Sequence, residues 1–277
     1  MNRRALLLGL GACACHGARA PAFTFARAAL GVAREAGEAN AEQERASLAE
    51  LGRIAGLAQQ ALARAPHLPP DNVLSTLLFG SLGFVREVTD TDLRFVLLPS
   101  VLRERRGSCA GLGTLFLALA EALGWSANGV MMPGHFYVRV QGVPGPPGPA
   151  RNVELLHSGE SLPDSWYVHR FPIPAGAERE YGRPLSTRET LGVLQFDIGN
   201  ERRRQRRFGE ARRAYAAATG LFPDFAEAHA SLGATLQVLG DLDQAAASYR
   251  SALRLNPALA GITQNIALLE TEREQAH

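Results

Sequence analysis

The sequence contains no lysine, so all 29 of its basic residues are arginines. The chain therefore has no lysine amine through which it could be cross-linked to itself. Its 27 acidic residues leave a formal net charge of +2. Such a balance favours neither a nucleic-acid binder nor an enzyme for strongly acidic substrates, because both usually rely on a broad field of one sign.

Cysteine is almost as scarce, with three residues in 277. Cys13 and Cys15 lie close to the N-terminus, and only Cys109 lies in the body of the chain. A disulfide framework is therefore excluded once the first two are removed or tethered. A single buried cysteine is most often a small core residue, but a leftover thiol in an exported protein also indicates reactivity.

A hydrophobic run long enough to span a membrane permanently is absent from the N-terminus, where a shorter one follows Arg3 and Arg4. A basic start and a short apolar stretch predict an export signal over residues 1–22, and the arginine pair also fits a twin-arginine signal. Residues 10–13 resemble a lipobox, which would leave Cys13 as a lipidated first residue. A cut after Ala22 would instead release a soluble protein. We expect an exported protein of the cell envelope, either periplasmic or lipid-anchored to the membrane.

Residues 23–65 are rich in Ala, Glu, Arg and Gln, and their later part shows helical spacing. We predict a tether to about Gln43 and then a helix that Ser47 caps and Pro66 ends. A second helix is expected to open at Asp71 and to close at Gly80 and Gly83, and a further helical element is expected over 93–101.

Cys109 opens the next apolar segment. Gly107 and Ser108 are typical of a turn and a helix N-cap. The apolar residues that follow recur at helical spacing: Leu112, Leu115, Phe116, Leu119, Ala120 and Leu123. Cys109 is thus predicted at the start of a buried helix, where the free N–H groups and the helix dipole favour the thiolate.

A strand with alternating side chains follows the Pro133-Gly134 turn. Its pattern places Phe136, Val138 and Val140 on one face and His135, Tyr137 and Arg139 on the other. After a Pro- and Gly-rich loop, residues 152–155 indicate a partner strand on which Asn152 and Glu154 point the same way. A thiol at a helix start, an imidazole on one strand and a carboxylate on the next could act as nucleophile, base and orienting group.

Several short blocks carry a resemblance to a known family. They are Leu98-Pro99-Ser100-Val101-Leu102, Arg106-Gly107-Ser108-Cys109, Leu123-Gly124, Pro133-Gly134-His135 and Asn152-Val153-Glu154. This order resembles the bacterial transglutaminase-like superfamily of papain-related cysteine hydrolases and acyl transferases, above all SirB-type domains that carry tetratricopeptide repeats. The resemblance covers roughly residues 71–181. It implies an α+β core in which Cys109 is the nucleophile, His135 the base and Glu154 the orienting acid.

The resemblance also implies the chemistry. The Cys109 thiolate would attack an amide or ester carbonyl of a protein or peptide substrate, and the backbone N–H of Cys109 would contribute to the oxyanion site. Hydrolysis by a cysteine peptidase or amidase is favoured over transfer to an amine. We expect no cofactor and no metal, since an acidic cluster like the calcium sites of animal transglutaminases is absent.

Other assignments stay open at this point. Many members of the superfamily carry Asp where Glu154 stands, and Asn152 is a second candidate for the orienting group. We prefer Glu154, because a carboxylate stabilises the imidazolium that forms during acyl transfer. His157 and His169 are rival bases, although a histidine in a polar loop is usually just solvated. Many SirB-type members have lost the cysteine, so the alternative function is a non-catalytic scaffold or adaptor of the cell envelope.

The C-terminal part shows a 34-residue period. The matching pairs are Gly199 with Gly233, Ala211 with Ala245, Tyr215 with Tyr249, Ala218 with Ala252 and Pro223 with Pro257. Small, aromatic and proline positions at this period are typical of tetratricopeptide repeats, which suggests a protein partner. We predict a transglutaminase-like domain at about 66–182 and an all-α repeat module at about 190–277, closed by a helix over 262–274.

An arginine cluster marks the first repeat. It comprises Arg202, Arg203, Arg204, Arg206, Arg207, Arg212 and Arg213. The simplest interpretation is a solvated helix face. An acidic partner or an anionic lipid surface is the alternative.

Overall fold

The computed structural model describes residues 23–87, 92–144 and 148–275. The predicted export signal, with Cys13 and Cys15, lies outside the described residues. The described chain combines many helices with two small sheets, as the predicted α+β class requires, and ends in a purely helical region. Within the described ranges no helix is both long and apolar enough to cross a membrane.

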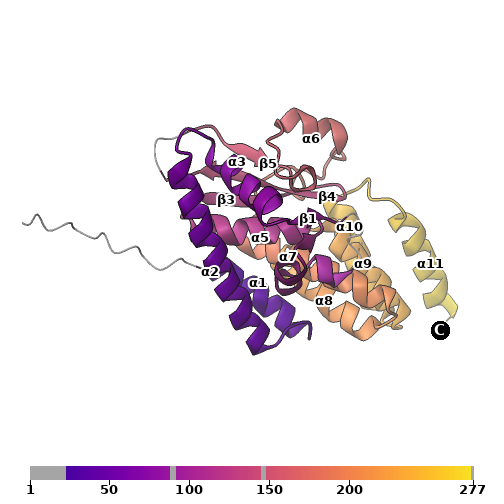
Figure 1. The fold of residues 1–277 in the computed structure, drawn as a ribbon. Helices are drawn as coiled ribbons and strands as arrows, with labels where there is room; N and C mark the ends of the chain where they lie inside the picture. Colours follow the sequence, from indigo (N-terminus) through magenta and orange to yellow (C-terminus); the bar gives the residue numbers. More distant parts are fainter. Residues whose placement is uncertain (1–22, 88–91, 145–147, 276–277) are drawn as a thin grey trace, which may run out of the picture.

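Helices dominate the first hundred residues. They are α1 (Thr24–Glu35), α2 (Ala41–Arg64), α3 (Pro70–Ser75), the π-helical turn η1 (Thr76–Ser81), the 3-10 turn η2 (Leu93–Phe95) and α4 (Leu98–Glu104). Their arrangement around the rest of the molecule is visible in Figure 1.

The tether predicted for residues 23–43 is wrong. Residues 24–35 form α1, whose buried face includes Phe25 and Leu30, and the Phe25 N–H donates to Glu121 Oε2 at 2.9 Å. Half of the buried residues of α1 are alanines, which made the segment resemble a low-complexity linker. Asn40, rather than Ser47, caps α2, because Asn40 and Gln43 form a reciprocal capping box.

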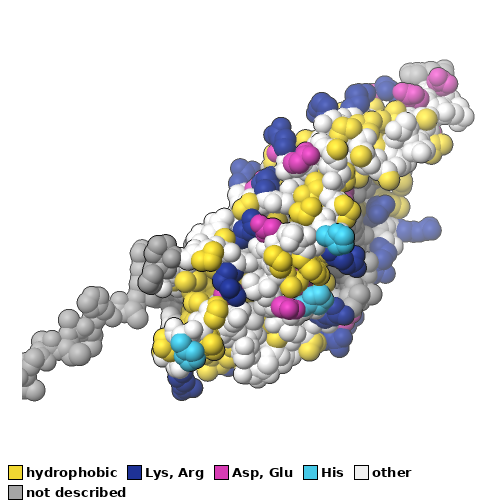
Figure 2. Space-filling model, turned by 90° about the horizontal axis from the view of Figure 1, so that it is seen from above, with side chains coloured by type: hydrophobic (Ala, Val, Ile, Leu, Met, Phe, Trp, Pro, Cys, Tyr) yellow, Lys and Arg dark blue, Asp and Glu magenta, His cyan; other side chains and the backbone are white. Residues whose placement is uncertain are grey.

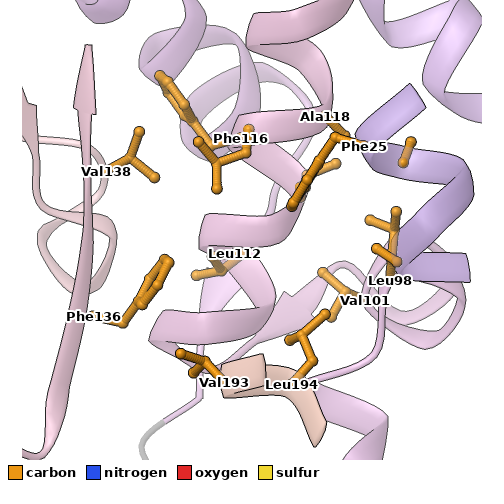
Figure 3. Packing of buried hydrophobic residues seen from close by; sticks show 14 of the residues in the cluster. Phe25, Leu98, Val101, Leu112, Phe116, Ala118, Phe136, Val138, Val193 and Leu194 are labelled. Atoms are coloured by element: carbon orange, nitrogen blue, oxygen red, sulfur yellow. The ribbon is translucent and has the colours of Figure 1, made fainter. Parts of the chain in front are cut away.

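Helix α5 (Cys109–Ala122) lies at the centre of the core. Figure 3 shows Leu112, Phe116 and Ala118 of this helix facing side chains from several elements. Strand β4 supplies Phe136 and Val138, while helix α1 supplies Phe25. Nearly every residue of α5 is buried, so the helix is held on all sides and its first residue has a fixed position.

The larger sheet has three antiparallel strands in the order β3 (Ser126–Met132), β4 (His135–Gly142) and β5 (Arg151–Val153). The predicted β4–β5 hairpin is confirmed, whereas strand β3 was not predicted. A second, parallel sheet joins β1 (Val85–Arg86) to β2 (Arg106–Gly107). Helix α6 (Asp164–Arg170) packs on the sheet face opposite α5 (Figure 1), where its Tyr167 meets Tyr137.

Two glycines allow the Phe136 ring to lie between α5 and β3. A Cβ atom on Gly113 would lie 2.5 Å from this ring, and one on Gly129 would lie 2.2 Å from it. Contacts this short are forbidden, so both positions need glycine. Phe136 thereby locks the start of β4, which carries His135, against the cysteine-bearing helix.

The repeat module consists of α7 (Thr187–Arg204), α8 (Phe208–Leu221), α9 (Ala226–Val238), α10 (Leu242–Leu255) and α11 (Ile262–Gln275). The 34-residue period has a direct structural cause. A Cβ atom on Gly199 would lie 2.5 Å from the Tyr215 ring, and one on Gly233 would lie 2.7 Å from the Tyr249 ring. In each repeat a glycine of the first helix therefore lets a buried tyrosine of the second helix pack closely.

The repeat module docks on the N-terminal module through residues 179–181. The Tyr181 hydroxyl donates to Glu227 Oε1 at 2.7 Å, and the Glu227 N–H donates to Glu180 Oε1 at 3.3 Å. Arg179 pairs with Asp224 at the exposed rim. Glu180 is 1% exposed, and its Oε2 has no hydrogen-bond partner among the described residues. Burial, together with the nearby Glu227 charge, raises the pKa of Glu180 to about 8.

We expect this carboxyl to make stability depend on pH. An unfolded glutamate releases its proton near pH 4.3, whereas folded Glu180 holds it to about pH 8, so stability falls as the pH rises between these values. Glu180→Gln should be the more stable protein at pH 8, by on the order of 2 kcal/mol, and should lose this advantage near pH 4.5. Urea unfolding at both pH values measures the difference. The exposed neighbour variant Glu178→Gln should show no such trend, and parallel curves for Glu180→Gln and wild type would contradict the assignment.

Candidate active site

The start of α5 is fixed by hydrogen bonds on both sides of Cys109. The Ser108 Oγ accepts the Gly111 N–H at 3.2 Å, as an N-cap does. The Ser108 N–H donates to the Phe95 carbonyl at 2.7 Å, which ties the turn to η2. Cys109 is the first residue of the helix and is partly buried. The predicted thiol at a helix N-terminus is therefore present, and the N–H groups of the first turn surround it.

His135 begins β4 and forms a buried pair with Glu154. The two atoms His135 Nε2 and Glu154 Oε2 are 2.7 Å apart, and the two side chains are 4% and 1% exposed. Because a carboxylate only accepts hydrogen bonds, Nε2 carries the hydrogen, and Nδ1 is the nitrogen that can exchange a proton. Glu154 is fixed in turn, since its Oε1 accepts the Leu156 N–H at 2.9 Å. The pair thus has the geometry of a base and its orienting acid.

Aromatic rings hold the imidazole from the side. The Phe171 ring stacks on His135 at 4.4 Å between centroids, with an interplanar angle of 11°. Tyr167 stacks on Tyr137 at 3.8 Å and reaches His135 at 6.3 Å. Burial, reinforced by the Glu154 charge, raises the pKa of Tyr167 well above its ordinary value, so its hydroxyl stays protonated. Tyr167 is fully buried, so it packs in the core.

The alternative site residues lie elsewhere. Asn152 accepts from Arg139 Nε at 2.9 Å and donates to Asp164 Oδ1 at 2.7 Å, so its side chain is occupied by an ionic network beside β5. His157 packs edge-on against Trp166, and both His157 and His169 are exposed. Neither lines the cleft described below.

A cleft of about 830 Å³ brings Cys109 and His135 together. Its floor comes from the N-terminal module, with Ser108, Met131 and Met132 beside the two site residues. Its other wall comes from the repeat module, with side chains from α7 and α9 and from the segment before α11. The volume is in the range of ligand-binding sites, and the lining mixes apolar and charged groups.

Sequence reasoning missed the residues that enclose this site. Phe171 directly follows α6, and no local pattern marks it as the neighbour of a residue 36 positions earlier. Tyr181 and Glu227 line the cleft from two modules that the sequence treats as separate. Their hydrogen bond depends on how the modules dock, which periodicity does not reveal. Within the described residues no group of three or more His, Cys, Asp or Glu side chains could hold a metal ion.

Comparison with protein families agrees with the observed architecture. The family described as the transglutaminase-like superfamily matches residues 45–192, and the tetratricopeptide repeat family matches residues 196–260. The first match starts within α2, earlier than the residue 66 expected for the domain. No curated protein matches the chain. The resemblance inferred from the cysteine, histidine and acid blocks is confirmed at the level of the domain layout.

Proposed function

Because the chain belongs to the transglutaminase-like superfamily, we propose that it is a cysteine hydrolase or acyl transferase that acts through Cys109, His135 and Glu154. The observation that carries the proposal is the buried His135–Glu154 hydrogen bond of 2.7 Å beside a cleft that Cys109 also lines. Burying an ion-pairing carboxylate and an imidazole without use would be unfavourable, since both must leave water. The arrangement is of the kind that activates a thiol.

The residues divide the first half-reaction among them. His135 Nδ1 takes the proton of the Cys109 thiol, and the thiolate forms a bond to the carbonyl carbon of an amide or ester. The carbonyl oxygen becomes an oxyanion, which the N–H of Cys109 stabilises. The C–N or C–O bond then breaks, and the imidazolium returns the proton to the leaving amine or alcohol. Glu154 holds the ring and stabilises its positive charge throughout.

The second half-reaction releases the acyl group from Cys109. Water gives a proton to His135 as its oxygen attacks the thioester, and breakage of the C–S bond yields a carboxylic acid and the thiol. An amine could replace water and would yield a new amide. Hydrolysis is favoured, since water needs no binding site of its own. The non-catalytic scaffold remains the alternative that the experiments below test.

The reactivity of the thiol gives the direct test of this proposal. An activated Cys109 should be alkylated by iodoacetamide at a rate that stays high well below pH 8.5, near which a free thiol has its pKa. The rate is measured by mass spectrometry of the Cys109 peptide between pH 5 and 9. A rate that follows an ordinary thiol, or alkylation only in denaturant, would return Cys109 to a packing role.

We also propose export to the cell envelope, with Cys13 as a lipidated residue or with a cut after Ala22. Within the described residues the first buried side chain is Phe25, so a cut after Ala22 lies before every buried side chain that the structure describes. Metabolic labelling with a clickable fatty acid should mark the wild type and miss Cys13→Ala if the lipid is attached. An unlabelled mature protein that starts at Phe23 would support the soluble form, and a cytoplasmic full-length protein would contradict export.

A further inference from the structure

The second wall of the cleft belongs to the repeats. Helix α7 contributes Val193, Phe196, Asp197, Asn200, Arg203 and Arg204, and α9 contributes Glu227, Ala230 and Ser231. With Phe196 and Asp197 taken as one step and Arg203 and Arg204 as another, the α7 residues recur at intervals of three or four, so they form one stripe along the helix. Val193 starts this stripe next to Phe136 and Leu112, as Figure 3 shows. The stripe therefore begins at the reaction centre and leads away from it.

The charges along this stripe differ between its two ends. Asp197 lies one turn after Val193. Glu227 accepts a hydrogen bond from the Tyr181 hydroxyl, and the N–H of the next residue, Gly182, donates to the carbonyl of Met131, which lines the cleft beside His135. The end near the reaction centre is thus acidic. The distant end carries two arginines.

Only one of these arginines is available to a ligand. Arg204 is neutralised by Glu201, which it contacts through Nε at 2.8 Å and NH2 at 2.7 Å. Arg203 is exposed, and its side chain interacts with the Tyr215 hydroxyl, a neutral partner that leaves the guanidinium charge in place. Of the predicted arginine cluster, Arg202 is buried against Glu38, and Arg207 pairs with Glu210. The interpretation of the cluster as one solvated face therefore does not apply to all its members.

We propose that the repeat module reads the substrate of Cys109 itself, by holding an extended peptide along α7 with an acidic side chain of the peptide paired to Arg203. The inference rests on the proposed function and names its substrate class. A peptide fits because the lining alternates apolar rings, such as Phe196 and Phe225, with isolated charges of both signs. On the face shown in Figure 2 the two signs are also interspersed, so selectivity depends on local pairing rather than on a broad field.

Helix geometry sets the position of the acidic residue. Val193 and Arg203 are ten positions apart, which corresponds to about 15 Å along a helix with a rise of 1.5 Å per residue. An extended peptide advances about 3.3 Å per residue. The acidic side chain should therefore lie about four or five residues from the acyl group that reacts with Cys109.

Hexapeptides that carry a chloroacetyl group at one end can test this register. The group is attached either to the N-terminal amine or to a C-terminal aminoethyl amide. The peptide can then extend from Cys109 along α7 in either chain direction. Each position carries Glu, Gln or Lys in turn, and the rate of Cys109 labelling is divided by the rate for chloroacetamide alone. In one direction, Glu at the fourth or fifth position should react about two- to fivefold faster than Gln, which is the size of a partly exposed ion pair.

Matched variants separate recognition from folding. Arg203→Gln should remove the preference for Glu, whereas Arg250→Gln on α10 should keep the preference and leave the chloroacetamide rate unchanged. Ser231→Trp narrows the cleft and should slow every hexapeptide about tenfold relative to chloroacetamide, whereas Ser251→Trp, whose residue does not line the cleft, should not.

Two outcomes would overturn the inference: no position with a preference for Glu, or a preference that survives Arg203→Gln. The inference would also be contradicted if Ser231→Trp left the rates of the hexapeptides, relative to the rate of chloroacetamide, the same as in the wild type. The proposed function fails separately, if chloroacetamide labels native Cys109 no faster than it labels a free cysteine. The chloroacetamide rate thus tests the proposed function, and the hexapeptide rates test the role of the repeat module.

Discussion

Replacing His135 with alanine should lower the rate at which an acyl-directed electrophile labels Cys109 at pH 7 by about 10²- to 10⁴-fold, the usual contribution of a general base. The cause is that His135 Nδ1 generates the thiolate and its imidazolium stabilises it, while Glu154 acts through His135, by holding the ring and stabilising its charge. Labelling is followed by intact-protein mass spectrometry with a peptidyl acyloxymethyl ketone, and Cys109→Ala gives the background.

Glu154→Gln should weaken labelling less than His135→Ala does. The glutamine can still accept the Leu156 N–H through its own Oε1, so the turn after β5 keeps its hydrogen bond. It loses the charge that stabilises the imidazolium, and its amide cannot accept from His135 Nε2 if the nitrogen faces the ring. Effects within such a unit are strongly non-additive, so the double variant should resemble His135→Ala alone.

The main risk is that His135→Ala disturbs the fold. It leaves the Glu154 carboxylate buried without its partner, which typically costs about 3–5 kcal/mol. The double variant His135→Ala/Glu154→Gln avoids this, because a neutral amide replaces the unpaired charge. Thermal melting of both proteins shows whether the loss of labelling follows the loss of stability. Exposed His157→Ala and His169→Ala serve as matched controls and should label like the wild type. Equal labelling of Cys109 in all these proteins would leave the domain as a scaffold.

Local signals predicted the elements on which the three candidate residues lie. The N-cap and the helical spacing marked the start of α5, and alternation marked β4 and its hairpin with β5. Glu154 was preferred over Asn152 on chemical grounds, and it is Glu154 that contacts His135. The repeat period was readable because a glycine–tyrosine contact recurs at fixed spacing within each repeat. All these features depend either on contacts between residues close in sequence or on the pairing of two neighbouring strands, which a local pattern can reveal.

What the sequence did not reveal depends on contacts over long distances. Helix α1 is held by packing on α4, α5 and α7, and these long-range contacts cannot be read from the segment itself. Phe171 reaches His135 through the return of the chain after α6. The shared cleft depends on the docking of two modules, which Tyr181 and Glu180 fix through Glu227. These features made the repeats look like a separate binding unit, whereas they form part of the site.

Gly111→Ala should destabilise the protein by about 3 kcal/mol or more, because the added methyl group has no room. A Cβ atom on Gly111 would lie 2.1 Å from the Phe95 carbonyl oxygen and 3.0 Å from Val101 Cγ2. The oxygen cannot rotate away as a side chain could, since it belongs to the backbone and also accepts the Ser108 N–H. Relief of the clash must therefore move η2 or the first turn of α5, and with it Cys109. The free energy of unfolding and the alkylation rate of Cys109 should both fall.

A second glycine of a helix separates this steric effect from the effect of helix propensity. Gly52 lies within α2, and a Cβ atom there would meet nothing within 4 Å. Gly52→Ala should therefore stabilise the protein by about 0.5–1 kcal/mol, since alanine reduces the conformational entropy of the unfolded chain. Glycine to alanine should thus lower the free energy of unfolding at position 111 and raise it at position 52, because only at Gly111 does a backbone oxygen occupy the space of the added methyl group. Urea unfolding of both variants decides the matter. If Gly111→Ala were as stable as Gly52→Ala and kept a reactive Cys109, the close approach of η2 would not be what positions the thiol.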